Sequence, residues 1–191
     1  MIFNPEIVIY AYRHGYFPMA EGEMEDIYWH SPNPRAIIPL DNIKKRSRSL
    51  TKSIRKNEFK CTMDLDFEQV IRACSDRKDT WISEEIIETY CELNKMGIAH
   101  SVETWMGNKI VGGLYGISLG SAFFGESMFN TEADAAKAAF YYLIEYLKSK
   151  KFSLLDSQYI NKFTEQLGAI EISKREYYRM LEIALENKNL L

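Results

Sequence analysis

Cysteine and histidine are scarce in this 191-residue chain. Cys61, Cys74 and Cys91 are odd in number and widely spaced, so they suggest neither a disulfide framework nor a zinc-binding motif. The three histidines are equally scattered and show no paired ligand spacing. We therefore predict reduced cysteines and no metal site.

Long apolar runs are also missing. No stretch approaches the ~20 consecutive apolar residues that a membrane helix requires, and the first five residues, MIFNP, lack the basic-then-apolar order of a secretory signal. These features predict a soluble cytoplasmic protein with no membrane partner. Gly-x-Gly-x-x-Gly and Walker patterns do not occur, so the sequence predicts no nucleotide-binding loop of those kinds and no cofactor.

Positive charge is concentrated in one segment of a chain whose net charge is −3. Residues 44–60 hold eight basic residues and one acidic residue, a net charge of +7, which leaves −10 for the rest of the chain. If the segment is helical, one face carries Arg48, Lys52, Arg55 and Lys56. A solvated helix face is the common explanation for such a run. Cations without interleaved acids also favour contact with a phosphate backbone, so both interpretations stay open.

Capping and turn residues divide the first half of the chain into short elements. Asn4 followed by Pro5 predicts a helix over 5–14. Asp66 and Ser83 are predicted N-caps of helices that end near residues 74 and 97. The cap residues thus locate three helices before the chain changes character.

The second half of the chain begins with β-branched and aromatic runs over 99–126, broken by turn residues, which predict a β-meander. Within it, Gly112 and Gly113 indicate a bulge or a close approach of ligand or backbone. Thr131 is predicted to cap the next helix. The remaining predicted elements are a strand over 152–155, a helix over 162–167, a strand over 169–172 and a final helix capped by Ser173. Helices mixed with an antiparallel core predict an α+β fold.

Polar residues that follow apolar strands are the candidate reactive groups. Asp156 and Gln158 are two residues apart at a strand end and should point to the same side. A carboxylate can orient an amide, whose oxygen can accept a hydrogen bond from an attacking amine. A pair that only satisfies backbone groups is the commoner explanation. Glu126 either binds a ligand or marks where its strand meets water, and Trp81 either stacks on a base or packs in the core.

Eight stretches of the chain, taken together and in order, resemble the leucyl/phenylalanyl-tRNA–protein transferase family. They are YRHGYFP (12–18), WHSPNPR (29–35), TWI (80–82), GIAHSVE (97–103), VGGLYG (111–116), FGESMF (124–129), DSQ (156–158) and SKREY (173–177). Each is short, but the ordered set covers nearly the whole chain. The sequence is therefore identified as similar to this family.

The resemblance implies a reduced N-terminal domain over residues 1–35 and a GNAT-like acyltransferase domain over 36–191. It also implies residue roles. Asp156 and Gln158 match the family's catalytic pair, and Trp81 and Glu126 match residues that hold the terminal adenosine, with Asn161 beside it. The pocket for the aminoacyl side chain is matched by Leu114, Phe123, Phe140, Leu143, Leu147 and Leu155. The basic cluster that binds the tRNA acceptor stem is matched by Arg48, Lys52, Arg55 and Lys56. Met19 stands where the family often has a tryptophan that stacks on the adenine.

The activity implied by the resemblance is transfer of leucine or phenylalanine from aminoacyl-tRNA to the N-terminal amine of proteins that begin with Arg or Lys, which marks them for degradation. An aminoacyl ester is already activated, so the reaction requires neither metal nor cofactor, and an apolar pocket should tolerate methionine. A GNAT-fold acyl-CoA N-acyltransferase is one alternative, although residues 127–132 lack the glycines of a pyrophosphate-binding turn. A non-catalytic RNA-binding module is the other, favoured by the basic segment and disfavoured by the acidic remainder.

Overall fold

The computed structural model describes residues 3–21, 26–45, 48–55, 58–77 and 80–187, and within 48–55 it leaves several side chains undescribed. The α-helices in these ranges are α1 (Pro5–Arg13), α2 (Arg48–Arg55), α3 (Phe67–Ser75), α4 (Glu84–Lys95), α5 (Ala135–Ser149), α6 (Lys162–Leu167) and α7 (Lys174–Glu186), with a 3-10 turn η1 (Leu40–Asn42). The strands are β1 (Phe17–Glu21), β2 (Asp26–His30), β3 (Arg35–Ile37), β4 (Lys60–Met63), β5 (Ala99–Met106), β6 (Lys109–Leu119), β7 (Ala122–Asn130), β8 (Leu154–Gln158) and β9 (Ile170–Ile172).

Two sheets form in the described part of the chain. β1 and β2 make a small antiparallel hairpin, and the other strands form a seven-stranded sheet in the order β4-β5-β6-β7-β8-β3-β9. Within the large sheet β7 and β8 are parallel, whereas the other neighbours are antiparallel. The predicted β-meander is confirmed, because β5, β6 and β7 follow one another in space as they do in sequence. Helices and a mainly antiparallel sheet confirm the predicted α+β class.

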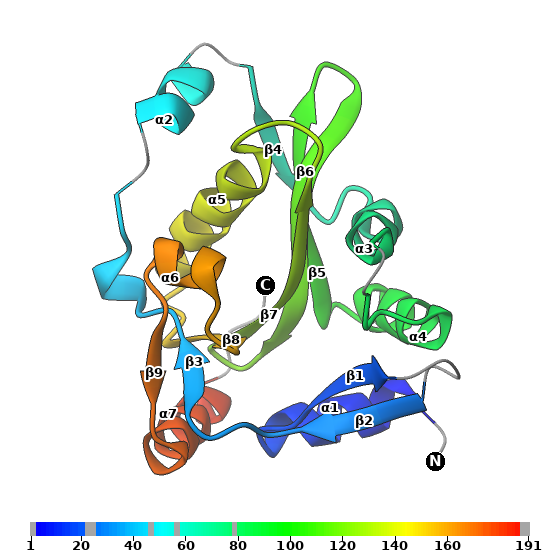
Figure 1. The fold of residues 1–191 in the computed structure, drawn as a ribbon. Coiled ribbons are helices and arrows are strands. Elements are labelled where there is room, and N and C mark those ends of the chain that lie inside the picture. Colours follow the sequence, from blue (N-terminus) through cyan, green and yellow to red (C-terminus); the bar gives the residue numbers. More distant parts are fainter. Residues whose placement is uncertain (1–2, 22–25, 46–47, 56–57, 78–79, 188–191) are drawn as a thin grey trace.

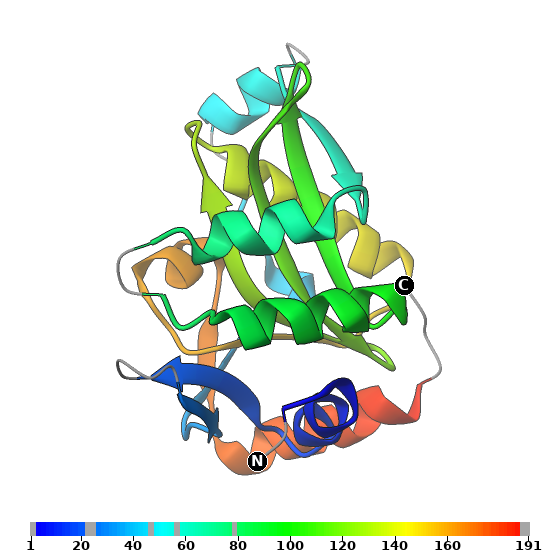
Figure 2. The ribbon, with the colours of Figure 1, turned by 90° about the vertical axis from the view of Figure 1, so that its right-hand side faces the viewer.

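Helices cover both faces of the large sheet (Figures 1 and 2). α3 and α4 pack on one face, and the core there includes Ile71, Tyr90 and Tyr115 together with residues of α1 and α7. α5 packs on the opposite face, where Phe140 and Leu147 belong to a second buried cluster. Because side chains alternate along each strand, neighbouring residues of β6, β7 and β8 contribute to opposite cores.

Most of the predicted helix starts are confirmed. Asn4, Asp66, Ser83 and Ser173 each accept a hydrogen bond from a backbone N–H in the first helical turn. The predicted cap at Thr131 is wrong. α5 begins only at Ala135, because residues 131–134 form a turn in which the Thr131 backbone N–H donates to the carbonyl of Val111 on β6 (2.8 Å).

The predicted close approach at Gly112 is confirmed. A Cβ on Gly112 would lie 2.6 Å from the Cβ of Ala135, well inside van der Waals contact, so only glycine allows α5 to begin so near β6. The strand predicted over 152–155 lies later than expected, as β8, and includes Asp156 and Gln158. The helix assumed for the basic segment is confirmed as α2, whereas Lys56 lies outside the described residues.

The large sheet opens between its two parallel strands. β7 and β8 pair only from Ala122–Leu154 to Phe124–Asp156. Beyond this point β7 runs on beside β6 as far as Asn130, while β8 ends at Gln158. The ends of β7 and β8, which no longer pair with each other but still pair with β6 and β3, border the space in which the candidate site lies.

Candidate active site

A cavity of about 380 Å³ lies where β7 and β8 part. Such a volume falls within the range of small-molecule sites, roughly 300–1,000 Å³. Its lining comes from the α3–α4 connection, β6, β7, α5, β8 and α6, and includes residues of both cores. The cavity therefore passes through the opening in the sheet from one face to the other.

Glu126 reaches this cavity because it is the extra residue of a β-bulge. On β6 and β7, Tyr115 pairs with Ser127 and Gly116 pairs with Gly125, which leaves Glu126 without a partner. Such bulges bend a strand and re-aim a side chain, often beside active sites. Glycine is needed opposite, since a Cβ on Gly116 would lie 2.2 Å from the carbonyl oxygen of Phe124. The position of the carboxylate thus depends on two strands.

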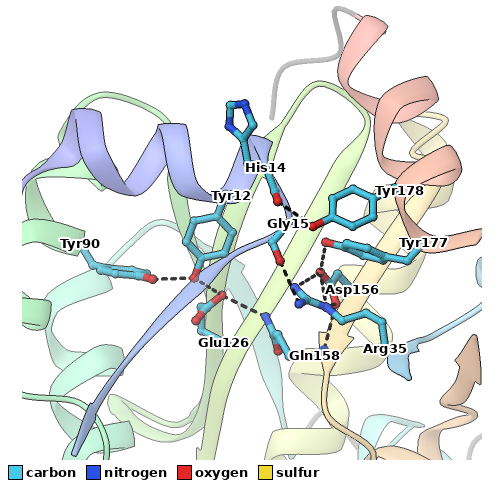
Figure 3. Close-up of polar contacts among 10 residues, drawn as sticks. All are labelled: Tyr12, His14, Gly15, Arg35, Tyr90, Glu126, Asp156, Gln158, Tyr177 and Tyr178. Carbon is cyan, nitrogen blue, oxygen red and sulfur yellow. Dashed lines mark hydrogen bonds and ion pairs between the residues drawn. The ribbon is translucent and has the colours of Figure 1, made fainter. Parts of the chain in front are cut away.

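A short polar network surrounds the Glu126 carboxylate (Figure 3). The Tyr12 hydroxyl donates to Oε1 of Glu126 (2.7 Å) and lies 2.7 Å from the hydroxyl of Tyr90. The side-chain amide of Gln158 donates from Nε2 to the same Oε1 (3.2 Å). Burial raises the pKa of Glu126 to about 8, against the opposite effect of the Tyr12 hydrogen bond. The network therefore contains a carboxyl group that titrates near neutral pH.

Asp156 is fully buried and carries a saturated set of hydrogen bonds. Arg35, also buried, donates from Nε and Nη2 to the two carboxylate oxygens, with a shortest distance of 2.7 Å. The hydroxyl of Tyr177 donates to Oδ2 (2.7 Å), and the backbone N–H of Gln158 donates to Oδ1 (2.9 Å). Asp156 consequently holds the backbone N–H of Gln158, whereas the side-chain amide of Gln158 bonds to Glu126. The sequence-based hypothesis that Asp156 orients this amide directly is therefore corrected.

Gln158 ends β8 in a left-handed conformation, with φ of 57°. This conformation is uncommon for a residue other than glycine and is sustained by the Asp156 contact to its N–H. The side-chain amide points toward Glu126 (Figure 3). Among the described residues, none donates to the Gln158 amide oxygen, so this acceptor remains available at the cavity.

The structure brings most of the predicted site residues together. Those that line the cavity are Trp81, Leu114, Glu126, Phe140, Leu143, Leu155, Asp156, Gln158 and Asn161. Phe123 and Leu147 are not in the lining; they are fully buried in the core beside α5. Asn161 has a further role, because its side-chain oxygen caps α6. On α2, Arg48 and Lys52 are exposed, while the side chain of Arg55 and all of Lys56 lie outside what the structure describes.

Sequence reasoning missed the residues that support the site from a distance. Tyr12, Tyr90, Arg35 and Tyr177 were not predicted to take part, although each lies in or next to a motif or element that the sequence singled out. Arg77, which also lines the cavity, was missed as well. Arg35 and Tyr177 end two of the family-like stretches, and that position was the one available signal.

Two further findings bear on the sequence-based expectations. Within the described residues, no group of three or more His, Cys, Asp or Glu side chains is arranged to hold a metal ion. Across the same residues, none of the helices has both the length and the apolar character needed to cross a membrane.

An α+β domain whose sheet opens onto a cavity with a carboxyl and an amide at one end and apolar side chains at the other has the form of a small-molecule or acyl-group binding enzyme. Comparison with known families is more specific. The model for the Leucyl/phenylalanyl-tRNA protein transferase family matches residues 37–182, and the model for the N-terminal domain of the same family matches residues 1–33. The chain belongs to the leucyl/phenylalanyl-tRNA–protein transferase family and is a transferase.

Two relatives with similar sequences agree with this assignment. The leucyl/phenylalanyl-tRNA–protein transferase of Gloeobacter violaceus is 50% identical over 182 residues, which cover 95% of this chain and 94% of the relative. The protein of the same name from Chlorobaculum parvum is 50% identical over 187 residues and 96% of each chain. Among solved structures, an aminoglycoside acetyltransferase from a soil metagenome is similar over 58% of this chain and 84% of its own, with 16% identity and a TM-score of 0.45.

Proposed function

We propose that this protein transfers leucine or phenylalanine from aminoacyl-tRNA to the N-terminal amine of acceptor proteins. The observation that carries the proposal is one cavity in which an apolar lining meets the Glu126–Gln158 pair. Membership of the family supports the reaction class. Because tRNA is the donor, the cytoplasm is the expected site of action.

The apolar end of the cavity would select the aminoacyl group. Leu114, Phe140, Leu143 and Leu155 line it and offer no charged or hydrogen-bonding side chain. A pocket of this kind discriminates by shape, and one methylene is worth only about 1–3 kcal/mol. In this proposal the pocket accepts both leucine and phenylalanine, with methionine as a minor substrate.

The polar end of the cavity supplies groups for attack of an amine on the ester carbonyl. In our proposal the neutral acceptor amine donates a hydrogen bond to the free amide oxygen of Gln158. This hydrogen bond orients the lone pair of the amine nitrogen toward the ester carbonyl. As the C–N bond forms and the ester C–O bond to the tRNA ribose breaks, the amine loses a proton. The ionised Glu126, bonded to Gln158 through Nε2, is the nearby base of suitable pKa to receive this proton and to pass it on to the ribose oxygen, which leaves as a hydroxyl group.

Asp156 contributes indirectly in this scheme. Its carboxylate fixes the backbone N–H of Gln158, and Arg35 and Tyr177 fix the carboxylate in turn. Such a support keeps a catalytic side chain in position without contact to substrate. Asp156 thus remains part of the proposed catalytic pair as the residue that positions Gln158.

The rest of the donor would lie toward the other residues singled out in the sequence. Trp81 and Asn161 line the cavity and are proposed to contact the terminal adenosine. Arg48 and Lys52 on α2, continued by Arg55 and Lys56, are proposed to contact the acceptor stem, because exposed cations release counterions on binding phosphate. For the acceptor we propose proteins that begin with Arg or Lys.

Label transfer tests the proposed function directly. Purified protein is incubated with [14C]leucyl-tRNA and a peptide that begins with Arg, and acid-stable label on the peptide is measured. The control peptides begin with Ala or carry an acetylated N-terminus, and labelled acetyl-CoA replaces the donor in a parallel reaction. We expect label only with leucyl-tRNA and a free N-terminal Arg or Lys. Labelling from acetyl-CoA alone would contradict the proposal.

A further inference from the structure

Arg77 is a cation at the cavity that the proposed reaction does not use. Among the described residues that line the cavity, it is the one Lys or Arg. It lies between α3 and α4, four residues before Trp81. Its side chain is exposed, so it stands where the cavity meets solvent.

The Arg77 guanidinium is held in a fixed orientation by neutral partners. Nε donates to the carbonyl of Cys74 (2.9 Å), and Nη2 donates to Oγ of Ser127 (2.7 Å) and to the carbonyl of Met128 (2.8 Å). In the described chain Nη1 has no hydrogen-bond partner and no carboxylate neutralises the charge. A guanidinium that is oriented but not neutralised is prepared to bind an anion.

Other arginines near the sheet are occupied differently. Arg72, five residues earlier on α3 and also exposed, is paired with Glu68 and Glu84. Arg35 is buried against Asp156. Arg77 therefore differs from both in combining access to the cavity with a charge that no described acid neutralises.

The position of Arg77 relative to the rest of the cavity indicates which anion it would meet. The apolar lining residues Phe140 and Leu143 belong to α5, on one face of the sheet, whereas Arg77 and Trp81 come from the α3–α4 connection on the opposite face (Figures 1 and 2). A ligand that spans the opening thus has an apolar group at one end and an aromatic surface with a cation at the other. In an aminoacylated nucleotide, the base and its 5′-phosphate lie on the side away from the aminoacyl group.

We propose that Arg77 binds the phosphate on the 5′ side of the terminal nucleoside of the donor, and so determines that the enzyme takes an aminoacylated polynucleotide in preference to an aminoacylated nucleoside. The inference rests on the proposed function for the identity of the ligand. A purely structural role, in which Arg77 only ties the α3–α4 connection to β7, predicts equal effects of its removal on ligands with and without phosphate.

Two stable ligands that differ by one phosphate separate these roles. They are 3′-leucylamido-3′-deoxyadenosine, whose amide cannot act as a donor ester, and the same compound with a 5′-phosphate. Equilibrium binding of both is measured by calorimetry for the parent protein and for Arg77→Ala, Arg77→Lys and the matched control Arg72→Ala. A charge-assisted hydrogen bond of ordinary strength makes the phosphorylated ligand about tenfold or more tighter for the parent protein. We expect this ratio to fall to about one in Arg77→Ala, to be intermediate in Arg77→Lys and to be unchanged in Arg72→Ala.

The outcomes distinguish this inference from the proposed function. A parent protein that binds both ligands equally, or an Arg77→Ala protein that keeps the parental ratio, overturns the inference even if leucine transfer is observed. Conversely, a phosphate preference lost in Arg77→Ala supports it even if no transfer to peptides is detected. If Arg77→Ala unfolds, the ratio in Arg77→Lys decides, since a lysine retains the charge but not the bonds to Ser127 and Met128 in the same geometry.

Discussion

Glu126→Gln is the most informative change to the site, because it removes an ionisable group while preserving its shape. With a pKa of about 8, about a tenth of Glu126 is ionised at pH 7 and about nine tenths at pH 9. The folded-state pKa is raised, so the base is lost as the pH falls below about 8. The acceptor amine, with an ordinary pKa of about 7.7–8.0, must also be neutral. Below pH 7 two ionisations then limit the rate, which should fall about 100-fold per pH unit.

In Glu126→Gln only the ionisation of the acceptor amine remains, so the rate should fall about tenfold per unit. The assay is single-turnover transfer from leucyl-tRNA at saturating enzyme, quenched over seconds between pH 5.5 and 8.5, with a correction for ester hydrolysis. The slopes of the logarithm of the rate against pH are compared, not the absolute rates. This comparison separates proton acceptance from any effect that the substitution Glu126→Gln has on substrate binding. Identical slopes for the parent and the variant would refute the assignment of Glu126 as the base.

The same group has a consequence for stability. Its pKa is raised in the folded state above the ordinary value of about 4.3, so its stabilising contribution is fully present below about pH 4 and lost as the pH rises through about 8. The difference corresponds to at most roughly 5 kcal/mol, reduced by any water that enters the cavity. In urea unfolding, the free energy of unfolding of Glu126→Gln should therefore increase relative to that of the parent protein as the pH rises from 6 to 9. A constant difference over this range would contradict the raised pKa.

Five other substitutions test the remaining parts of the site. Gln158→Ala should slow single-turnover transfer by about 10²–10⁴-fold with donor affinity retained, and a parental rate would reduce Gln158 to a strand-end residue. Trp81→Ala should weaken donor binding by about 1–3 kcal/mol in a titration, whereas unchanged affinity would assign the indole to the core. Arg35→Met should lower the free energy of unfolding by about 3–5 kcal/mol in urea, because it leaves the Asp156 carboxylate buried without its cation; a loss below 1 kcal/mol would contradict this. Arg48→Ala and Lys52→Ala should each reduce the salt dependence of tRNA binding by about one charge, and an unchanged slope in the double variant would remove α2 from the interface.

Local signals in the sequence predicted local structure well. The caps at Asn4, Asp66 and Ser83 were predictable because a capping side chain bonds to a backbone N–H two or three residues away. Thr131 carried the same signal and was misleading, since the competing bond is to Val111 on a neighbouring strand. A cap residue therefore predicts a helix start only where no adjacent strand end binds the same turn.

The site itself depends on contacts between residues far apart in the chain. Arg35 and Asp156 are 121 residues apart, and Tyr12 and Glu126 are 114 apart, so neither pair produces a recognisable spacing. The family-like motifs identified Glu126, Asp156 and Gln158 as members of one site. They did not indicate which atom of Gln158 meets Asp156, because that contact depends on the left-handed backbone at the end of β8.

The bulge at Glu126 makes the length of β7 as important as its composition. Beyond the bulge, every side chain faces the side opposite to the one that an uninterrupted strand would give it, because facing alternates with each residue. Deleting one residue between Gly125 and Ser127 would restore regular pairing with β6 and at the same time remove the carboxylate from the cavity. Two kinds of change at this strand therefore have different consequences: a substitution at Glu126 alters the chemistry of the cavity and keeps the bulge, whereas loss of the bulge removes the carboxylate and leaves Ser127 paired with Tyr115.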